Sequence, residues 1–182
     1  MAGFDFDGEA QGGAAVKGFD AETFRRAMGS FATGVTVVGV ADGAGEHGMT
    51  ANAFMSGSAE PPLCLVSVNK RARTHALLMK AGAYGVSVLA EPQVALAKHF
   101  SGKPEKNADF PFSRLAGAPV LAGVCAQIAA RIETKLDCGD HTLFVGRILA
   151  LEVFERPPLL YHRGAFRNLS SRVAAAPQPE FW

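Results

Sequence analysis

The sequence predicts a mainly β protein, a barrel of strands with two or three flanking helices, and three observations favour this class. Most apolar segments are short β-branched runs or alternate with period two, as strands do. Strands follow one another without a helix between each pair, which argues against a doubly wound sheet. The chain also lacks a Gly-x-Gly-x-x-Gly fingerprint, so any nicotinamide nucleotide is not held in the Rossmann manner.

Length and composition favour one globular domain over the alternative of two. The 182 residues are 48% hydrophobic and 19% charged, with a formal net charge of +1, and they suffice for a sizeable core. The basic residues are dispersed apart from positions 70–73, and no apolar run reaches membrane-spanning length, so we expect neither a nucleic-acid nor a membrane partner. Three cysteines without a signal peptide indicate reduced thiols and a cytoplasmic location, with Cys64 and Cys125 as small core residues in strands.

The two ends of the chain are expected to lie outside the domain. Residues 1–17 are rich in glycine, alanine and acidic residues without periodicity, which is typical of a flexible N-terminal leader. We assign residues 18–172 to the domain and residues 173–182 to a C-terminal tail.

The domain is predicted to begin with a helix that Asp20 caps. The apolar face of this helix carries Phe24, Met28 and Phe31. Thr33-Gly34 then leads into a β-branched strand over residues 35–40, which ends in a hairpin-like turn at residues 42–45.

The stretch from residue 48 to residue 59 is predicted to be a strand without charged side chains. Its polar side chains share one parity, and small or flexible apolar ones share the other. A strand with one solvent-facing side is one interpretation, although such strands normally carry Lys, Glu or Arg. The alternative is a surface of small uncharged side chains that a flat heteroaromatic ring approaches closely, with Asn52 and the backbone bonding to the ring edge.

The next strand ends in a polar, basic bend. Residues 63–68 form an apolar run between Pro62 and Asn69, which indicates a core strand, and residues 74–81 favour a helix. The junction of the two carries polar and basic side chains within eight positions: Ser67, Asn69, Lys70, Arg71, Arg73 and Thr74. The first amides of a helix and nearby cations favour an anion such as phosphate, but a solvated basic turn gives the same spacing.

The middle of the chain alternates between strand and helix signals. Residues 83–89 predict a strand, and Glu91-Pro92 predicts the start of a helix that ends near Phe100-Ser101-Gly102, with glycine as the stop. Residues 103–114 are polar with two prolines, which favours a mobile loop able to cover a site.

The last third predicts a long hairpin. Residues 120–136 and 142–154 alternate in hydrophobicity, with a turn at residues 137–140 between them, and residues 158–161 add a final strand. His141 follows Gly139-Asp140 at the hairpin tip, where a lone histidine is ordinarily a surface residue. Cys138 and His141 have a Cys-x-x-His spacing, but no second ligand pair accompanies them, so we expect no metal site.

Several of these stretches resemble the short-chain flavin reductase family. The resemblance rests on residues 31–38, 48–54, 61–62 and 67–75, and it continues at residues 100–102, 139–141 and 161–164. The motifs occur in the family's order, so the series is specific although each motif alone is weak. The resemblance implies a Greek-key-like, FMN-binding split β-barrel and an NAD(P)H:flavin oxidoreductase.

The resemblance also implies which residues hold the flavin, either FMN or FAD. The cofactor-binding set is Thr33, Thr50, Ala51, Asn52, Ser56, Ser67, Val68, Asn69, Lys70, Arg73, Thr74, Phe100, Ser101 and Gly102. Within it, Asn52 and the 50–52 backbone meet the ring edge, and Ser67, Lys70 and Thr74 hold the phosphate. Gly57 departs from the family, which more often has a packing side chain there, and leaves the hydrogen-bonding roles of Ser56 and Ser58 open.

NADH or NADPH is the implied hydride donor. The nicotinamide-binding set is His141, Tyr161, His162, Arg163 and Gly164. Arg163 and Arg167 either meet the phosphates of the dinucleotide or are solvated. Because the hydride passes directly between the cofactors, no catalytic side chain is expected.

Three functions follow from the resemblance. The first is a reductase that supplies reduced flavin to a separate monooxygenase, and the second keeps its flavin and reduces another acceptor, such as a corrinoid or a ferric chelate. The third is a non-catalytic flavin-binding module. The resemblance further implies a homodimer with the flavin near the interface.

Overall fold

The computed structural model describes residues 18–43, 45–103 and 109–169. The predicted leader (1–17), the predicted tail (173–182) and residues 104–108 of the predicted loop lie outside the described residues. The remaining part of that loop runs into a short strand, β7 (Ser113–Leu115).

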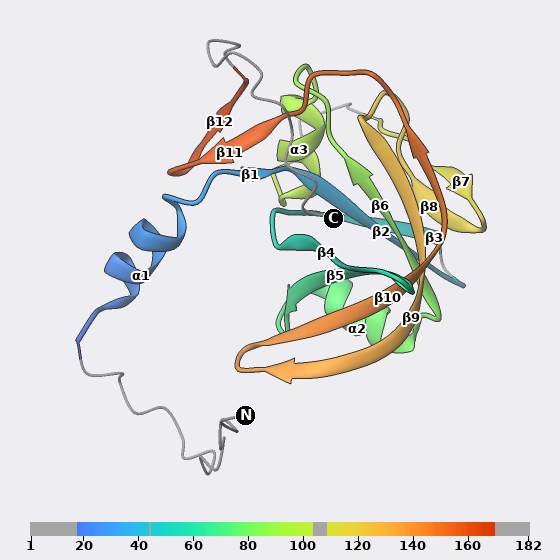
Figure 1. Cartoon of the computed structure of the whole chain (residues 1–182), viewed down its shortest axis with the longest axis horizontal. Helices are drawn as coiled ribbons and strands as arrows, with labels where there is room; N and C mark the ends of the chain where they lie inside the picture. Colours follow the sequence, from blue (N-terminus) through green and yellow to red (C-terminus); the bar gives the residue numbers. More distant parts are fainter. Residues whose placement is uncertain (1–17, 44, 104–108, 170–182) are drawn as a thin grey trace.

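A seven-stranded antiparallel sheet forms the body of the molecule, which confirms the mainly β prediction (Figure 1). Its strands, in spatial order, are β3 (Gly45–Ala51), β2 (Thr36–Asp42), β6 (Ala83–Val88), β9 (Ala126–Cys138), β10 (His141–Val153), β5 (Pro62–Asn69) and β4 (Phe54–Ala59). The two edge strands, β3 and β4, are consecutive in the chain, with only Asn52 and Ala53 between them. The sheet therefore has to curve until its edges approach each other, as in a barrel with an open seam.

Two smaller sheets accompany this body. β1 (Thr33–Gly34), β11 (Leu160–His162) and β12 (Ala165–Arg167) form one, and β7 pairs with β8 (Ala118–Val120) in the other. The sequence did not predict β7 or β12. The predicted final strand, residues 158–161, is shifted to β11 in the structure. After β11 the chain turns back at Arg163-Gly164, where both residues have positive φ, and continues into β12.

The described residues form three helices, of which the second and third pack against different parts of the core. α1 (Ala21–Met28) projects from the body in Figure 1, and the Asp20 side chain accepts a hydrogen bond of 2.7 Å from the Thr23 amide, as predicted. α2 (Arg73–Lys80) follows β5. α3 (Val94–Phe100) begins later than predicted, because the Ala90 amide donates to Gln93 Oε1 and holds residues 90–93 as a turn. No helix among the described residues is long and apolar enough to span a bilayer.

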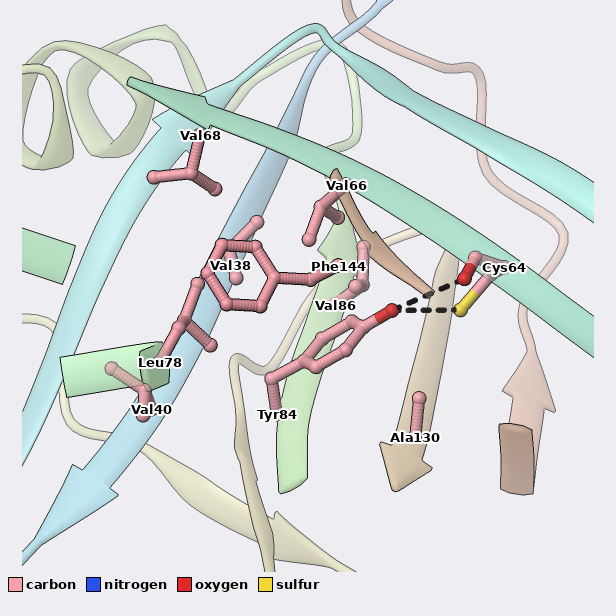
Figure 2. Packing of buried hydrophobic residues seen from close by; sticks show 10 residues of the cluster. All are labelled: Val38, Val40, Cys64, Val66, Val68, Leu78, Tyr84, Val86, Ala130 and Phe144. Atoms are coloured by element: carbon pink, nitrogen blue, oxygen red, sulfur yellow. Dashed lines mark hydrogen bonds between the residues drawn. The ribbon is translucent and has the colours of Figure 1, made fainter. Parts of the chain in front are cut away.

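Two clusters of buried side chains stabilise this arrangement. The first includes Val38, Val66, Leu78 and Phe144 around Tyr84, whose hydroxyl donates to the Cys64 carbonyl at 3.3 Å (Figure 2). The second packs α3 onto the other end of the sheet and contains Val35, Leu89, Leu96, Leu121 and Leu159. Burial of this apolar surface is the main stabilising contribution to the fold.

Two of the predicted strands are each broken in the structure. The charge-free stretch 48–59 splits at Asn52-Ala53 into β3 and β4, on opposite edges of the sheet. The stretch 120–136 splits between β8 and β9. Cys125 lies in that break, half-buried, and its thiol donates to the Leu89 carbonyl at 3.5 Å, so the prediction that it is a strand residue is wrong.

Candidate functional site

The free edge of β3 borders a cleft of about 490 Å³, called here the Asn52 cleft. Thr50, Ala51 and Asn52 line one side of it, and the end of α3 lines another. The Thr50 hydroxyl donates to the Ala97 carbonyl at 2.7 Å, which fixes β3 against α3. Within the described residues β3 has a strand neighbour on one side only, so this edge presents unpaired backbone groups to the cleft.

A second hollow of about 530 Å³, the Arg73 hollow, lies further back along the same strand. Met49 and His47 of β3 line it, together with Arg73 and Thr74 at the beginning of α2. Ala72 caps α2 without a side-chain hydrogen bond, and no acidic residue lies in the first turn. Glu46 of β3 also lines the hollow, and its carboxylate forms an ion pair of 2.7 Å with Arg114. The positive end of α2 therefore faces the hollow without an acidic side chain from its own first turn.

The turn after α3 separates these two spaces. The Gly102 amide donates to the His99 carbonyl at 3.3 Å and the Lys103 amide to the Lys98 carbonyl at 3.2 Å, which is the Schellman pattern. Gly102 has φ +85°, which confirms it as the glycine stop. Phe100 and Gly102 line the Arg73 hollow, whereas Ser101 lines the Asn52 cleft.

A third, mainly apolar space of about 360 Å³, the Thr33 hollow, opens on the other side of Asn52. Asn52 lines both this hollow and the Asn52 cleft, so it lies where the two meet. Ser67 and Thr33 add polar groups to the apolar wall. The Thr33 hydroxyl oxygen is buried and has no hydrogen-bond partner, which is a costly state for a protein group without a ligand.

The residues of the basic bend, 67–74, lie in different environments. Arg73 and Thr74 line the Arg73 hollow, and Ser67 lines the Thr33 hollow. Lys70 forms an ion pair of 3.1 Å with Asp137 at the β9–β10 tip. Asn69 accepts a hydrogen bond from the Arg71 amide and donates to Asp140, so its amide is occupied within the bend.

Two predicted cofactor residues lie away from these spaces. The Val68 side chain is buried in the core, so only its backbone is available. Ser56 lies on edge strand β4 and lines none of the three spaces. Beside it, Gly57 occupies a bulge where an added Cβ would come within 2.5 Å of Leu65 Cδ1, the movable end of a side chain.

His141 is at the tip of the β9–β10 hairpin and is half-exposed. Its Nδ1 lies 2.7 Å from Asp140 Oδ1, and this hydrogen bond lowers the pKa of the Asp140 carboxyl. His141 lines none of the three spaces, but it lies on the same face of β10 as Leu143, which lines the Thr33 hollow.

The other predicted nicotinamide residues are divided between two places. Tyr161 and Gly164 line the Asn52 cleft together with the predicted flavin residues. Arg163 instead faces α1, and its amide donates to the Gly29 carbonyl at 2.9 Å. His162 lines neither space. One chain therefore does not bring His141 and Tyr161 into a single cavity.

The structure adds residues that the motifs did not indicate. Two lysines, Lys98 and Lys103, line the Asn52 cleft, and His47 and His99 line the Arg73 hollow. These residues line the two spaces because α3 packs against β3. A local sequence pattern does not predict that tertiary contact. In the described part of the chain, no three His, Cys, Asp or Glu side chains gather as metal ligands.

Comparison with known proteins identifies a family model, described as a flavin reductase like domain, that matches residues 28–170. The chain is 40% identical over 148 residues to an NADH-dependent flavin reductase of a Rhodococcus species, covering 80% of this chain and 84% of that protein. It is also 40% identical over 149 residues to the reductase component of 4-hydroxyphenylacetate 3-monooxygenase from Thermus thermophilus, covering 81% and 96%.

Solved structures give the same result. The flavin reductase PheA2 superposes with a TM-score of 0.82 at 40% identity, covering 84% of this chain and 100% of that one. The NADH:FAD oxidoreductase SgcE6 of Streptomyces globisporus, in complex with NAD and FAD fragments, superposes with a TM-score of 0.77 at 34% identity, covering 85% and 96%. The split-barrel architecture expected from the sequence is therefore shared with these structures.

Proposed function

Because the chain belongs to the flavin reductase like domain family, we propose that it transfers a hydride from NADH to FMN or FAD and supplies the reduced flavin to a separate monooxygenase. The names of its relatives support NADH as the donor and a two-component monooxygenase as the recipient. The structural observation that carries the proposal is the run of small side chains, Thr50 to Asn52, along the free edge of β3.

The residues along this edge fit a flavin. A flat ring system requires close approach to small side chains, together with hydrogen-bond partners at its edge, and the Asn52 cleft offers both. Among the residues that the structure describes, no acidic side chain lines the cleft. The Thr33 hydroxyl is buried and unpartnered, and Thr33 lines the same hollow as Asn52, so we infer that a ligand bound there satisfies this hydroxyl.

The phosphate of the flavin belongs in the Arg73 hollow. Arg73, Thr74 and the uncapped amides of α2 supply a cation, a hydroxyl and helix N–H groups. Lys70 is a weaker candidate than the bend alone suggested, because Asp137 already compensates its charge. Ser101 and Gly102 lie between ring and phosphate, where the ribityl chain would pass.

The two cofactor rings are expected to meet at Asn52, which lines both the Asn52 cleft and the Thr33 hollow. When bound, NADH supplies the hydride and the flavin accepts it, so no protein nucleophile or strong acid is needed. The side chains around Asn52 therefore orient the rings and exclude water. Tyr161 and Gly164 would hold the nicotinamide from the cleft, and His141 would reach it from the side of the Thr33 hollow.

We further propose that the protein is a homodimer. Leu151 and Val153 share one face of β10 and are 56% and 74% exposed, and Leu149, which lies at a bulge in the same strand, is 49% exposed. Phe24 and Met28 of α1 are 50% and 59% exposed. Exposed apolar surface of this extent is typical of an interface, and a second copy is the occupant that the family resemblance favours.

Reduced thiols at Cys64, Cys125 and Cys138 are compatible with the cytoplasmic location that we propose.

The function is tested by measuring NADH oxidation with added FMN, FAD or riboflavin. A reductase oxidises NADH in proportion to added flavin, whereas a non-catalytic flavin-binding module does not. If the protein remains yellow through gel filtration and added flavin gives no further turnover, it keeps its flavin and reduces another acceptor, and the proposed transfer to a monooxygenase is wrong.

A further inference from the structure

The Arg73 hollow contains a titratable side chain to which the flavin assignment gives no role. His47 lies on β3, opposite Val40 of β2, and lines the hollow together with Arg73 and Thr74. It is half-buried, so its imidazole is partly removed from water. A histidine beside an arginine and a helix N-terminus is a group whose charge an anionic ligand will change.

The charged and titratable groups around His47 come from five elements. Arg73 approaches from α2 and Asp42 from β2. Glu46 is its neighbour on β3, and the carboxylate of Glu46 forms an ion pair of 2.7 Å with Arg114 on β7. His99 lines the same hollow from α3. The negative charge of Glu46 is therefore compensated by Arg114, and the cation that acts on His47 is Arg73.

A second imidazole, that of His99, also lines the hollow. The Nδ1 atom of His99 is buried and has no hydrogen-bond partner. The His99 ring packs edge-on against Phe100 and Phe110, with centroids 4.8 and 5.1 Å apart, so it is held in place. Buried polar atoms are normally satisfied, and a ligand or its bound water completes such a group.

Burial, and then the charge of Arg73, lower the pKa of His47, while Asp42 acts in the opposite direction. The free protein therefore holds His47 mostly neutral near neutral pH. A phosphate placed beside Arg73 would favour the protonated imidazole and raise that pKa.

We propose that His47 is a titratable ligand of the flavin phosphate, which takes up a fraction of a proton from solvent when a phosphorylated flavin binds. The protein then prefers FMN and FAD over riboflavin more strongly at acidic than at alkaline pH. This inference rests on the proposed flavin site. The imidazolium donates to a phosphate oxygen, so no bond other than N–H is formed, and the proton returns to solvent on release.

The direction of the pH effect follows from the protonation of His47 on binding. The additional affinity is present below the pKa of His47 in the free protein and is lost as the pH rises through the higher pKa of the complex. Riboflavin has no phosphate, so it gains none of this affinity. We expect the ratio of FAD to riboflavin affinity to fall about three- to fivefold between roughly pH 5.5 and 8.5, as for a partly exposed ion pair.

Isothermal titration calorimetry on the full chain tests this directly. FAD is the preferred probe, because its pyrophosphate keeps its charge over this range, whereas a phosphomonoester such as that of FMN titrates near pH 6, to within about a unit. Titration in buffers of different ionisation enthalpy measures the proton uptake. Wild type should take up protons on binding FAD and none on binding riboflavin.

Three variants test whether His47 causes the pH dependence of the affinity ratio. His47→Gln should make the affinity ratio independent of pH, and His47→Lys should keep a high ratio at both extremes, because its charge does not titrate in this range. His99→Gln should keep the wild-type pH dependence. A pH dependence that survives in His47→Gln, or that disappears only in His99→Gln, overturns the proposal.

The outcome is separable from that of the proposed function. If wild type neither binds nor reduces riboflavin and FAD, the flavin assignment itself fails. If both flavins are bound and reduced and the affinity ratio is flat with pH, only the role of His47 is wrong.

Discussion

At the scale of single residues, the Thr33 hydroxyl is informative because it is buried without a partner. Its position on the two-residue strand β1, opposite Tyr161, holds it at the wall of the Thr33 hollow. A protein that only needed to fold would be more stable with an isosteric apolar side chain there.

Thr33→Val should therefore have opposite effects on folding and on binding. We expect the free energy of unfolding to rise by about 1 kcal/mol, because the unsatisfied group is removed. Flavin affinity should fall about three- to tenfold, because a ligand hydrogen bond is lost. Urea denaturation and flavin titration measure the two quantities. An unchanged flavin affinity would show that the hydroxyl does not face the ligand.

Arg73 and Lys70 allow a second comparison within the bend. Arg73→Gln should weaken FMN and FAD binding about three- to tenfold, more at low salt than at high salt, and leave riboflavin binding unchanged. Lys70→Gln should have a smaller effect, since Asp137 already pairs with Lys70 at 3.1 Å. The reverse order of the two variants in equilibrium titrations would place the phosphate at Lys70 instead.

At the scale of elements, the close contact between β3 and α3 is decisive for the site. Gly48 permits it, because a Cβ there would lie 2.6 Å from Phe100 and 2.9 Å from Phe112. The same contact sets the turn at Ser101-Gly102 between the Asn52 cleft and the Arg73 hollow.

Gly48→Ala should displace α3. We expect a loss of about 1–3 kcal/mol in the free energy of unfolding, as for overpacking, together with weaker flavin binding. Gly43→Ala is the matched control, because nothing lies within 4 Å of the Cβ it would add. Thermal unfolding and flavin titration distinguish the two variants. Equal behaviour would mean that the β3–α3 contact adapts without affecting the site.

Local patterns predicted most elements but not their partners. The β9–β10 hairpin and the Gly102 stop follow from alternation and turn chemistry. The break at Asn52-Ala53 does not, because a continuous period-two pattern is the same for one strand or for two strands on opposite sheet edges. For the same reason His47, Lys98 and Lys103 were not predicted as site residues: only the tertiary meeting of α3 and β3 places them.

At the scale of the whole molecule, the core links stability to pH. Tyr84 is fully buried, and its hydroxyl lies 3.4 Å from the Cys64 thiol. Burial raises the pKa of Tyr84 and also that of Cys64. Both groups are therefore stabilising in their neutral forms only.

The free energy of unfolding should fall at alkaline pH. For each group the pKa in the folded state is higher than in the unfolded state, about 8.5 for Cys and 10 for Tyr. The stabilisation from burying the neutral group is therefore complete below the unfolded-state pKa and is lost as the pH rises above it. Urea denaturation between about pH 8 and 10.5 should show this decrease. Tyr84→Phe should flatten its upper part, and an equally steep loss in that variant would place the alkaline sensitivity elsewhere.

The proposed homodimer is tested by substitutions on the exposed face of β10. The double variant Leu151→Lys with Val153→Lys should convert a dimer to a monomer in light scattering, because two buried charges would then oppose association. Met79→Lys is the control, since Met79 is 45% exposed on α2, outside the proposed interface. A dimer that persists in the double variant would contradict the use of this face.

The central claim is that the free edge of β3 holds the flavin. The most direct measurement is a crystal structure of the protein with FMN. We predict the ring against Thr50–Asn52 in the Asn52 cleft and the phosphate beside Arg73 and Thr74 in the Arg73 hollow. A ring bound elsewhere on the molecule, with the edge of β3 left to solvent, would contradict the account.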